Sequence, residues 1–170
     1  MTPDVFRILF ISHVRPILEF GLPAAFPLTK GESDLIERVQ RRGSKSVVGL
    51  REFDYSNRLS FLNLFSMEYR RRRGDLIFAR RILRGDLGEE LMQFFTLNTS
   101  APTRGHPCKL FKPRRARMNN RLTLSTRVVN DWNRLPAPIV EASSEARFKS
   151  LVDDFLAPNT GYPASRMPQT

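Results

Sequence analysis

The chain has 170 residues, which is enough for one domain or two small lobes with a hydrophobic core. Hydrophobic residues make up 41% of it and charged residues 26%, a composition typical of globular rather than disordered chains. The net charge is +11, and 23 of the 28 basic residues are arginine, whose planar fork binds phosphate bidentately and stacks on bases. This balance predicts an anionic partner, although a lineage bias toward arginine would give the same composition.

Cysteine content and hydropathy bear on the compartment. Cys108 is the only cysteine, so an internal disulfide is excluded and an intracellular protein, nuclear or cytoplasmic and not secreted, is predicted. The apolar run Ile8–Ile11 is too short to span a bilayer and lacks a small-residue cleavage site. We therefore expect no membrane partner.

The first third of the chain predicts two helices. Pro3 and Asp4 open the first, whose apolar positions surround most of its circumference, so we expect a buried element that Pro16 kinks or ends. The second covers residues 32–50, and Gly43 on its apolar face predicts the close approach of another backbone. The opposite face carries a basic stripe spaced i, i+3, i+4 and i+7: Arg38, Arg41, Arg42 and Lys45.

The most basic predicted helix covers residues 66–85. Asp54 is the expected N-cap of a short preceding helix and Ser66 that of the basic one. At about 100° per residue, five arginines share one arc while apolar residues occupy most of the rest. These five are Arg70, Arg73, Arg80, Arg81 and Arg84. A charge run is usually a salt-bridged surface, but from Arg73 to Arg84 this helix carries only one acid, Asp75, which favours a polyanion or an acidic protein opposite it.

The pattern changes after residue 95. One or two helical turns over 88–95 are expected to contribute four core anchors: Leu91, Met92, Phe94 and Phe95. Residues 96–121 lose helical periodicity, with a short strand or hairpin expected near Lys109–Phe111. The basic residues proposed there for nucleic-acid contact are Arg104, Lys109, Lys112, Arg114, Arg115 and Arg117. Helical spacing resumes from Leu124 to Leu135, with Trp132 as a core anchor, and again over Phe148–Leu156.

These elements predict a mainly α fold, in which a small helical bundle is followed by a short irregular or β segment and two further helices. The expected organisation is a helical lobe over 1–95, a basic irregular segment with C-terminal helices over 96–157, and a disordered tail over 158–170.

No catalytic constellation is present in the sequence. His106 and Cys108 offer two metal ligands, whereas a zinc site needs three or four. Asp153 and Asp154 resemble the paired aspartates of nucleotide polymerases, but helical spacing around them predicts a solvated outward face. We expect no catalytic residue, no metal, no cofactor and no small-molecule substrate.

Five stretches, taken in order, carry a familiar pattern. They are VRPILEFG (14–21), DLIERVQRRGSKSVVGLR (34–51), YSNRLSFLNLFSMEYRRRRGDLI (55–77), TRGHPCKLFKPRRAR (103–117) and RVVNDWNRLPAPIVEASSEARFKSLVDDFL (127–156). Together they resemble the region downstream of the palm in LINE-type non-LTR retrotransposon reverse transcriptases. The resemblance covers most of the chain up to about residue 157.

The resemblance implies a thumb and C-terminal part that hold the RNA template and DNA primer during target-primed reverse transcription. Arg38–Lys45 and Arg70–Arg84 would then lie near the template–primer duplex, with residues 103–117 as a further contact. The family's [FY]xDD hairpin, endonuclease and fingers have no counterpart in this sequence. We therefore expect a fragment that binds RNA and DNA and does not polymerise DNA on its own.

Two alternatives stay open. One is a basic helical module that docks an acidic protein, its retroelement ancestry now incidental. The other is a retroelement relic without a selected function. Salt dependence separates the first alternative from nucleic-acid binding, because release of condensed counterions makes phosphate-driven affinity fall linearly in log salt.

Overall fold

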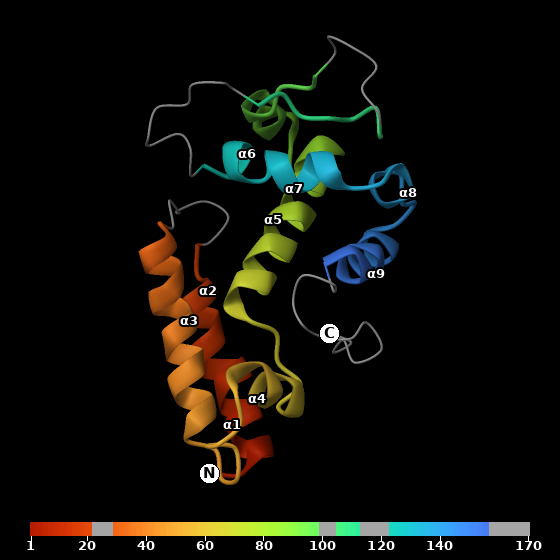
Figure 1. The fold of residues 1–170 in the computed structure, drawn as a ribbon. Coiled ribbons are helices and arrows are strands. Elements are labelled where there is room, and N and C mark those ends of the chain that lie inside the picture. The colour runs from red at the N-terminus through yellow and green to blue at the C-terminus, as the bar shows by residue number, and fades with distance from the viewer. Residues whose placement is uncertain (22–28, 99–104, 113–122, 157–170) are drawn as a thin grey trace. The chain divides into compact units, whose positions relative to one another are not determined.

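The computed structural model describes residues 1–21, 29–98, 105–112 and 123–156 (Figure 1). This part of the chain is mainly helical, which confirms the predicted fold class. Its β pairing is one isolated antiparallel bridge between Leu97 and Leu110, near the position where the sequence predicts a short strand. Backbone N–H groups of Asn98 and Phe111 each donate across the bridge over 2.7 Å. The predicted tail over 158–170 lies outside the described residues.

Two compact units divide the described residues. Unit 1 contains residues 1–21, 29–71 and Leu156, and unit 2 contains residues 72–98, 105–112 and 123–155. The division falls inside one continuous helix, whereas the sequence predicts a boundary near residue 95. Unit 1 holds α1 (Pro3–Leu9), the π-helix η1 (Phe10–Val14), α2 (Arg15–Glu19), α3 (Lys30–Lys45), α4 (Tyr55–Phe61) and the start of α5 (Met67–Leu83). Unit 2 holds the rest of α5, the 3₁₀ helix η2 (Glu89–Phe94), α6 (Leu124–Arg127), α7 (Val129–Arg134), α8 (Ala137–Val140) and all but the last residue of α9 (Glu145–Leu156).

The N-terminal helix passes through Pro16 without ending. A proline lacks an N–H, and its ring collides with the carbonyl four residues earlier in a regular α-helix. Here the π-turn η1 widens the helix just before Pro16, so α2 follows α1 as one rod. The prediction of a buried element is wrong, because Phe6 and Phe10 are buried while Val5, Ile8 and Leu9 are exposed.

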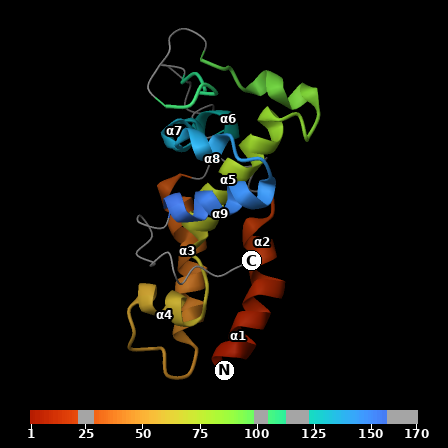
Figure 2. The ribbon, with the colours of Figure 1, turned by 90° about the vertical axis from the view of Figure 1, so that its right-hand side faces the viewer.

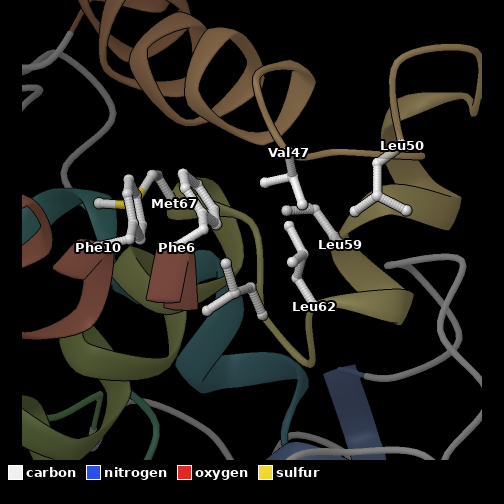
Figure 3. Close-up of a cluster of buried hydrophobic side chains, with 8 residues drawn as sticks. Phe6, Phe10, Val47, Leu50, Leu59, Leu62 and Met67 are labelled. Atoms are coloured by element: carbon white, nitrogen blue, oxygen red, sulfur yellow. The ribbon is translucent and has the colours of Figure 1, made fainter. Parts of the chain in front are cut away.

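The core of unit 1 forms where α1 and η1 meet the chain that follows α3 (Figure 3). Phe6 and Phe10 stack with ring centroids 5.5 Å apart. Gly43 of α3 explains the fit, because an added Cβ would lie 3.1 Å from the Phe6 ring. The predicted close approach is therefore real, although a ring rather than a backbone makes it. The other buried side chains of this core are Val47, Leu50, Leu59, Leu62, Leu64 and Met67.

Side-chain caps fix where the helices of unit 1 begin. Thr29 and Glu32 form a reciprocal capping box at the start of α3. The Asp54 carboxylate accepts from the Asn57 N–H at 2.7 Å, and the Ser66 hydroxyl accepts from the Tyr69 N–H at 3.1 Å. These two contacts confirm the predicted N-caps of α4 and α5.

The core of unit 2 surrounds α5 and α7. Trp132 is 2% exposed, confirming it as a core anchor, and its ring packs beside Phe148 of α9 with centroids 6.3 Å apart. Met92 and Phe94 are exposed, so the predicted core role of η2 is wrong for these two residues. None of the helices in the described ranges is both long and apolar enough to cross a membrane.

Candidate functional site

The arginines of α5 meet carboxylates from distant parts of the sequence. In unit 1, the Arg70 guanidinium donates two hydrogen bonds to the Glu19 carboxylate, one of them over 3.1 Å. In unit 2, Arg72 donates two hydrogen bonds to Asp131 of α7, over 2.9 and 2.8 Å. Each is a bidentate, charge-assisted contact, the strong form of an ion pair.

The same pattern recurs further along α5. Arg73 donates to both carboxylate oxygens of Asp153, over 2.5 and 3.0 Å. Asp75 accepts from Arg127 of α6 over 2.8 and 2.7 Å, and both side chains of this second pair are largely buried. Bidentate pairs therefore attach α6, α7 and α9 to α5 within unit 2.

The last turn of α5 binds the chain just before α9. Arg80 is buried, and one of its N–H groups donates to the Ala142 carbonyl over 2.9 Å, as does one of Arg84. The Arg80 guanidinium also lies over the Phe148 ring, 5.1 Å from its centroid. Burial lowers the pKa of Arg80 from its ordinary value. Arg81 remains more accessible, 3.8 Å from Glu145.

These contacts correct the sequence interpretation of α5. The expectation that its arginines lack acidic partners is wrong, because Glu19, Asp131 and Asp153 reach them from 51 to 80 residues away. Asp153 is half-buried in an ion pair rather than solvated, whereas Asp154 is exposed as predicted. Most of the α5 arginines therefore hold the fold together.

The basic stripe of α3 has a different environment. Arg38, Arg41, Arg42 and Lys45 are all exposed, as their helical spacing predicts. Within the described ranges, none of these four side chains forms an ion pair with a carboxylate. At about 1.5 Å of rise per residue, the stripe extends roughly 10 Å along the helix.

Two of the three acids of α3, Glu32 and Glu37, form hydrogen bonds away from this stripe, and the third, Asp34, is exposed one turn before Arg38. Glu32 is engaged in the capping box with Thr29. Glu37 accepts hydrogen bonds from the Tyr55 hydroxyl and from the Glu68 N–H at the start of α5. Two of the four cations, Arg42 and Lys45, lie in the last turn, where the helix dipole favours positive charge. The dipole stabilises these cations without neutralising them.

A stacking contact that the sequence does not predict orients the stripe. The Arg41 guanidinium lies over the Tyr55 ring, 4.5 Å from its centroid, and the buried Arg58 lies 5.6 Å from the same centroid. This stacking restricts the Arg41 side chain before any partner binds. The sequence carries no local signal for it, since Tyr55 belongs to the next helix.

The basic segment after residue 103 is only partly described. Lys112 is exposed and donates to the Asn130 side-chain oxygen over 3.0 Å, while Lys109 is half-buried. Arg104, Arg114, Arg115 and Arg117, the other predicted contacts, lie outside the described residues. Residues 104–121 carry seven basic and no acidic side chains, so this segment supplies much of the net charge.

Residues 106–110 are held against α7. The Trp132 indole N–H donates to the Cys108 carbonyl over 2.8 Å. The Asn133 side chain forms two 2.8 Å hydrogen bonds with the backbone of Leu110. His106 is buried, and its Nε2 lies 3.1 Å from the Trp132 carbonyl, which can only accept, so Nε2 carries the proton. No group of three or more potential metal ligands occurs among the described residues.

His106 gives unit 2 a pH dependence. Burial lowers its pKa in the folded chain, so below about pH 6.5 the unfolded chain binds a proton that the folded chain excludes. The stability contributed by the neutral ring is therefore complete above about pH 6.5 and declines as the pH falls toward the lowered folded-state pKa.

We expect urea midpoints measured from about pH 7.5 to 5.5 to fall across this window, and His106→Gln to remove that fall. The exposed His13 supplies the control, His13→Gln; a midpoint that rises as the pH falls would contradict the assignment.

No family model, curated protein or solved structure matches the chain. The resemblance to LINE-type reverse transcriptases therefore stays a prediction. The function is inferred from the contrast between the engaged arginines of α5 and the exposed cations of α3.

Proposed function

We propose that this protein binds nucleic acid through the basic stripe of α3, as the template–primer-holding part of a retrotransposon RNA-directed DNA polymerase. The observation that carries the proposal is the exposure of Arg38, Arg41, Arg42 and Lys45 without a carboxylate partner in the described part of the chain. Cations that the fold leaves uncompensated repel one another, and a polyanion relieves that repulsion.

The geometry of the stripe supports a phosphate backbone as the ligand. One strand of a duplex presents a phosphate about every 3.4 Å of helix axis, so a stripe of roughly 10 Å faces about three phosphates. Three of its four side chains are arginines, which bind phosphate oxygens with two parallel hydrogen bonds. Contacts of this kind position a duplex without reading its sequence.

The basic segment over 104–121 supports the same proposal by its charge. Seven cations without an acid attract any polyanion at long range, which raises the association rate at low salt. Among the basic residues of this segment that the structure describes, Lys112 is exposed. We propose this segment as a second, less specific contact for the RNA or DNA backbone.

Salt titration tests the proposal. The assay measures the fluorescence anisotropy of a labelled RNA–DNA hybrid of about 20 base pairs across a range of salt concentrations. We expect log affinity to fall linearly with log salt, and glutamine at all four stripe positions to reduce the slope by about three to four. This reduction of the slope is expected because binding releases about one counterion fewer for each phosphate contact that the variant has lost.

A charge-matched variant provides the control. Arg7, Arg51, Arg134 and Arg147 are exposed and scattered, so glutamine at these four positions removes the same net charge without touching the stripe. Its slope should stay close to that of the unmodified chain. An equal reduction of the salt slope in the two variants would show that the overall positive charge attracts the hybrid, and not a site on α3. Capture of an acidic protein without affinity for the hybrid at low salt would support the protein-interaction alternative.

A further inference from the structure

The N-terminal rod exposes an apolar stripe that unit 1 leaves uncovered. Ile8 of α1 is 66% exposed, and Ile17 and Phe20, at the end of α2, are 77% and 85% exposed. Val5 and Leu9 complete the stripe on α1. Figure 2 shows α1 and α2 as one rod along the edge of unit 1. Burial of such side chains is strongly favourable, so a cluster of five on one helix indicates a partner.

The π-turn η1 creates the stripe. With uninterrupted α-helical spacing, Ile17 would lie about 120° around the axis from Val5, on the side that Phe6 and Phe10 bury. A π-turn holds more residues than an α-turn and therefore shifts everything after it backward around the axis. The observed exposure of Ile17 and Phe20, on the same rod as Ile8, agrees with this shift. The core side of the rod is continued by Ile11, Val14 and Leu18.

The stripe is symmetric about its own centre. Val5, Ile8 and Leu9 on one half correspond to Phe20, Ile17 and Pro16 on the other, because each pair of residue numbers adds up to 25. The centre falls between Ser12 and His13, both of which are exposed. A helix face with this property is complementary to a second copy of itself running in the opposite direction, as a two-fold axis requires.

We propose that the rod formed by α1, η1 and α2 pairs antiparallel with the same rod of a second copy of this chain. In this register Ile8 lies opposite Ile17 of the second copy, and Val5 lies opposite Phe20. In residue number, this register pairs the four charged positions of the rod, Asp4, Arg7, Arg15 and Glu19, with the uncharged Gly21, Leu18, Phe10 and Phe6, so no charged position is paired with another.

The size of the stripe suits a dimer. The exposed parts of its five large side chains amount to roughly 500–600 Å² of apolar surface, at the upper limit of what a monomer usually shows. A standard stable interface buries about 800 Å² per partner, of which about 65% is apolar in homodimers. The stripe and its polar flanks together therefore match the area and the composition of a homodimer interface.

Sedimentation equilibrium of the nuclease-treated full chain, in about 0.5 M salt, tests the pairing. High salt weakens phosphate-mediated bridging but leaves an apolar interface intact. We expect a dimer, and we expect Ile17→Asp to raise its dissociation constant at least about a hundredfold, since every substitution enters a two-fold interface twice. Leu35→Asp, at an exposed apolar position of α3, is the matched control and should leave the dissociation constant unchanged.

Cross-linking tests the antiparallel register in a Cys108→Ser background. A short bis-maleimide should join two Ser12→Cys chains, and should join Ile8→Cys to Ile17→Cys. It should not join two Ile8→Cys chains, whose residues are about 13 Å apart along the axis in this arrangement. Self-linking of Ile8→Cys without that of Ser12→Cys would overturn the proposal. A monomer at all concentrations, with or without binding to phosphatidylcholine vesicles, or a dimer insensitive to Ile17→Asp, would overturn it as well.

Discussion

Trp132→Ala is expected to lower the unfolding free energy of unit 2 by about 3–5 kcal/mol, the upper range for a single truncation in a protein core. The indole is 2% exposed, packs beside Phe148 and His106, and donates its N–H to the Cys108 carbonyl. Truncation leaves a cavity and removes the donor from that carbonyl at the same time. Urea unfolding followed by far-UV circular dichroism measures the change.

Two further variants separate these contributions. Trp132→Phe keeps an aromatic ring in the core but loses the hydrogen bond to the Cys108 carbonyl, so its loss should be intermediate. Phe94→Ala removes an exposed aromatic ring from η2 and should change the unfolding free energy by no more than about 0.5 kcal/mol. A Trp132→Ala loss as small as that of Phe94→Ala would show that α7 does not centre the core of unit 2.

Arg127→Met is expected to lower the unfolding free energy by about 3–5 kcal/mol. The substitution takes from the buried Asp75 carboxylate the two N–H donors that now hold it over 2.8 and 2.7 Å. A buried charge that loses its bidentate counterion costs more than the pair contributes, so the double variant Arg127→Met with Asp75→Leu should recover most of the loss. Urea unfolding at low and high salt measures all three chains, with little salt effect expected for a buried pair.

A surface pair of the same unit supplies the control. Lys149 pairs with Glu145 one turn away on α9, and both side chains are more than a third exposed. Lys149→Met should therefore change stability by no more than about 0.5 kcal/mol. A double variant no more stable than Arg127→Met alone would show that Asp75 and Arg127 stabilise unit 2 through their other neighbours.

Local features of this fold could be predicted from the sequence. Asp54 and Ser66 cap α4 and α5 as expected, because capping depends on residues three positions apart. The core role of Trp132 followed from its shared helical face with Val128 and Leu135, which are also buried. Gly43 signalled a close approach because glycine is otherwise costly inside a helix.

Features that depend on tertiary contacts could not be predicted from the sequence. A count of the acids within α5 alone leaves out Asp131 and Asp153. These two bind Arg72 and Arg73 from 59 and 80 residues away in the sequence. Apolar residues surround most of α1, so their positions in the sequence do not show which side of the helix packs against the core. The π-turn before Pro16 also changes the helical period from which the buried side would be inferred. The α3 stripe was predictable because nothing distant neutralises it in the described part of the chain.

Arginine footprinting tests most directly whether α3 binds nucleic acid while the arginines of α5 hold the fold. A dicarbonyl reagent modifies accessible guanidinium groups, and mass spectrometry reads each peptide with and without the RNA–DNA hybrid. We expect Arg38 and Arg42 to react rapidly in the free protein and to be protected by the hybrid. Arg73 and Arg80 should react slowly in both states. Rapid reaction of Arg73 and Arg80 that the hybrid suppresses, with Arg38 and Arg42 unaffected, would contradict this account.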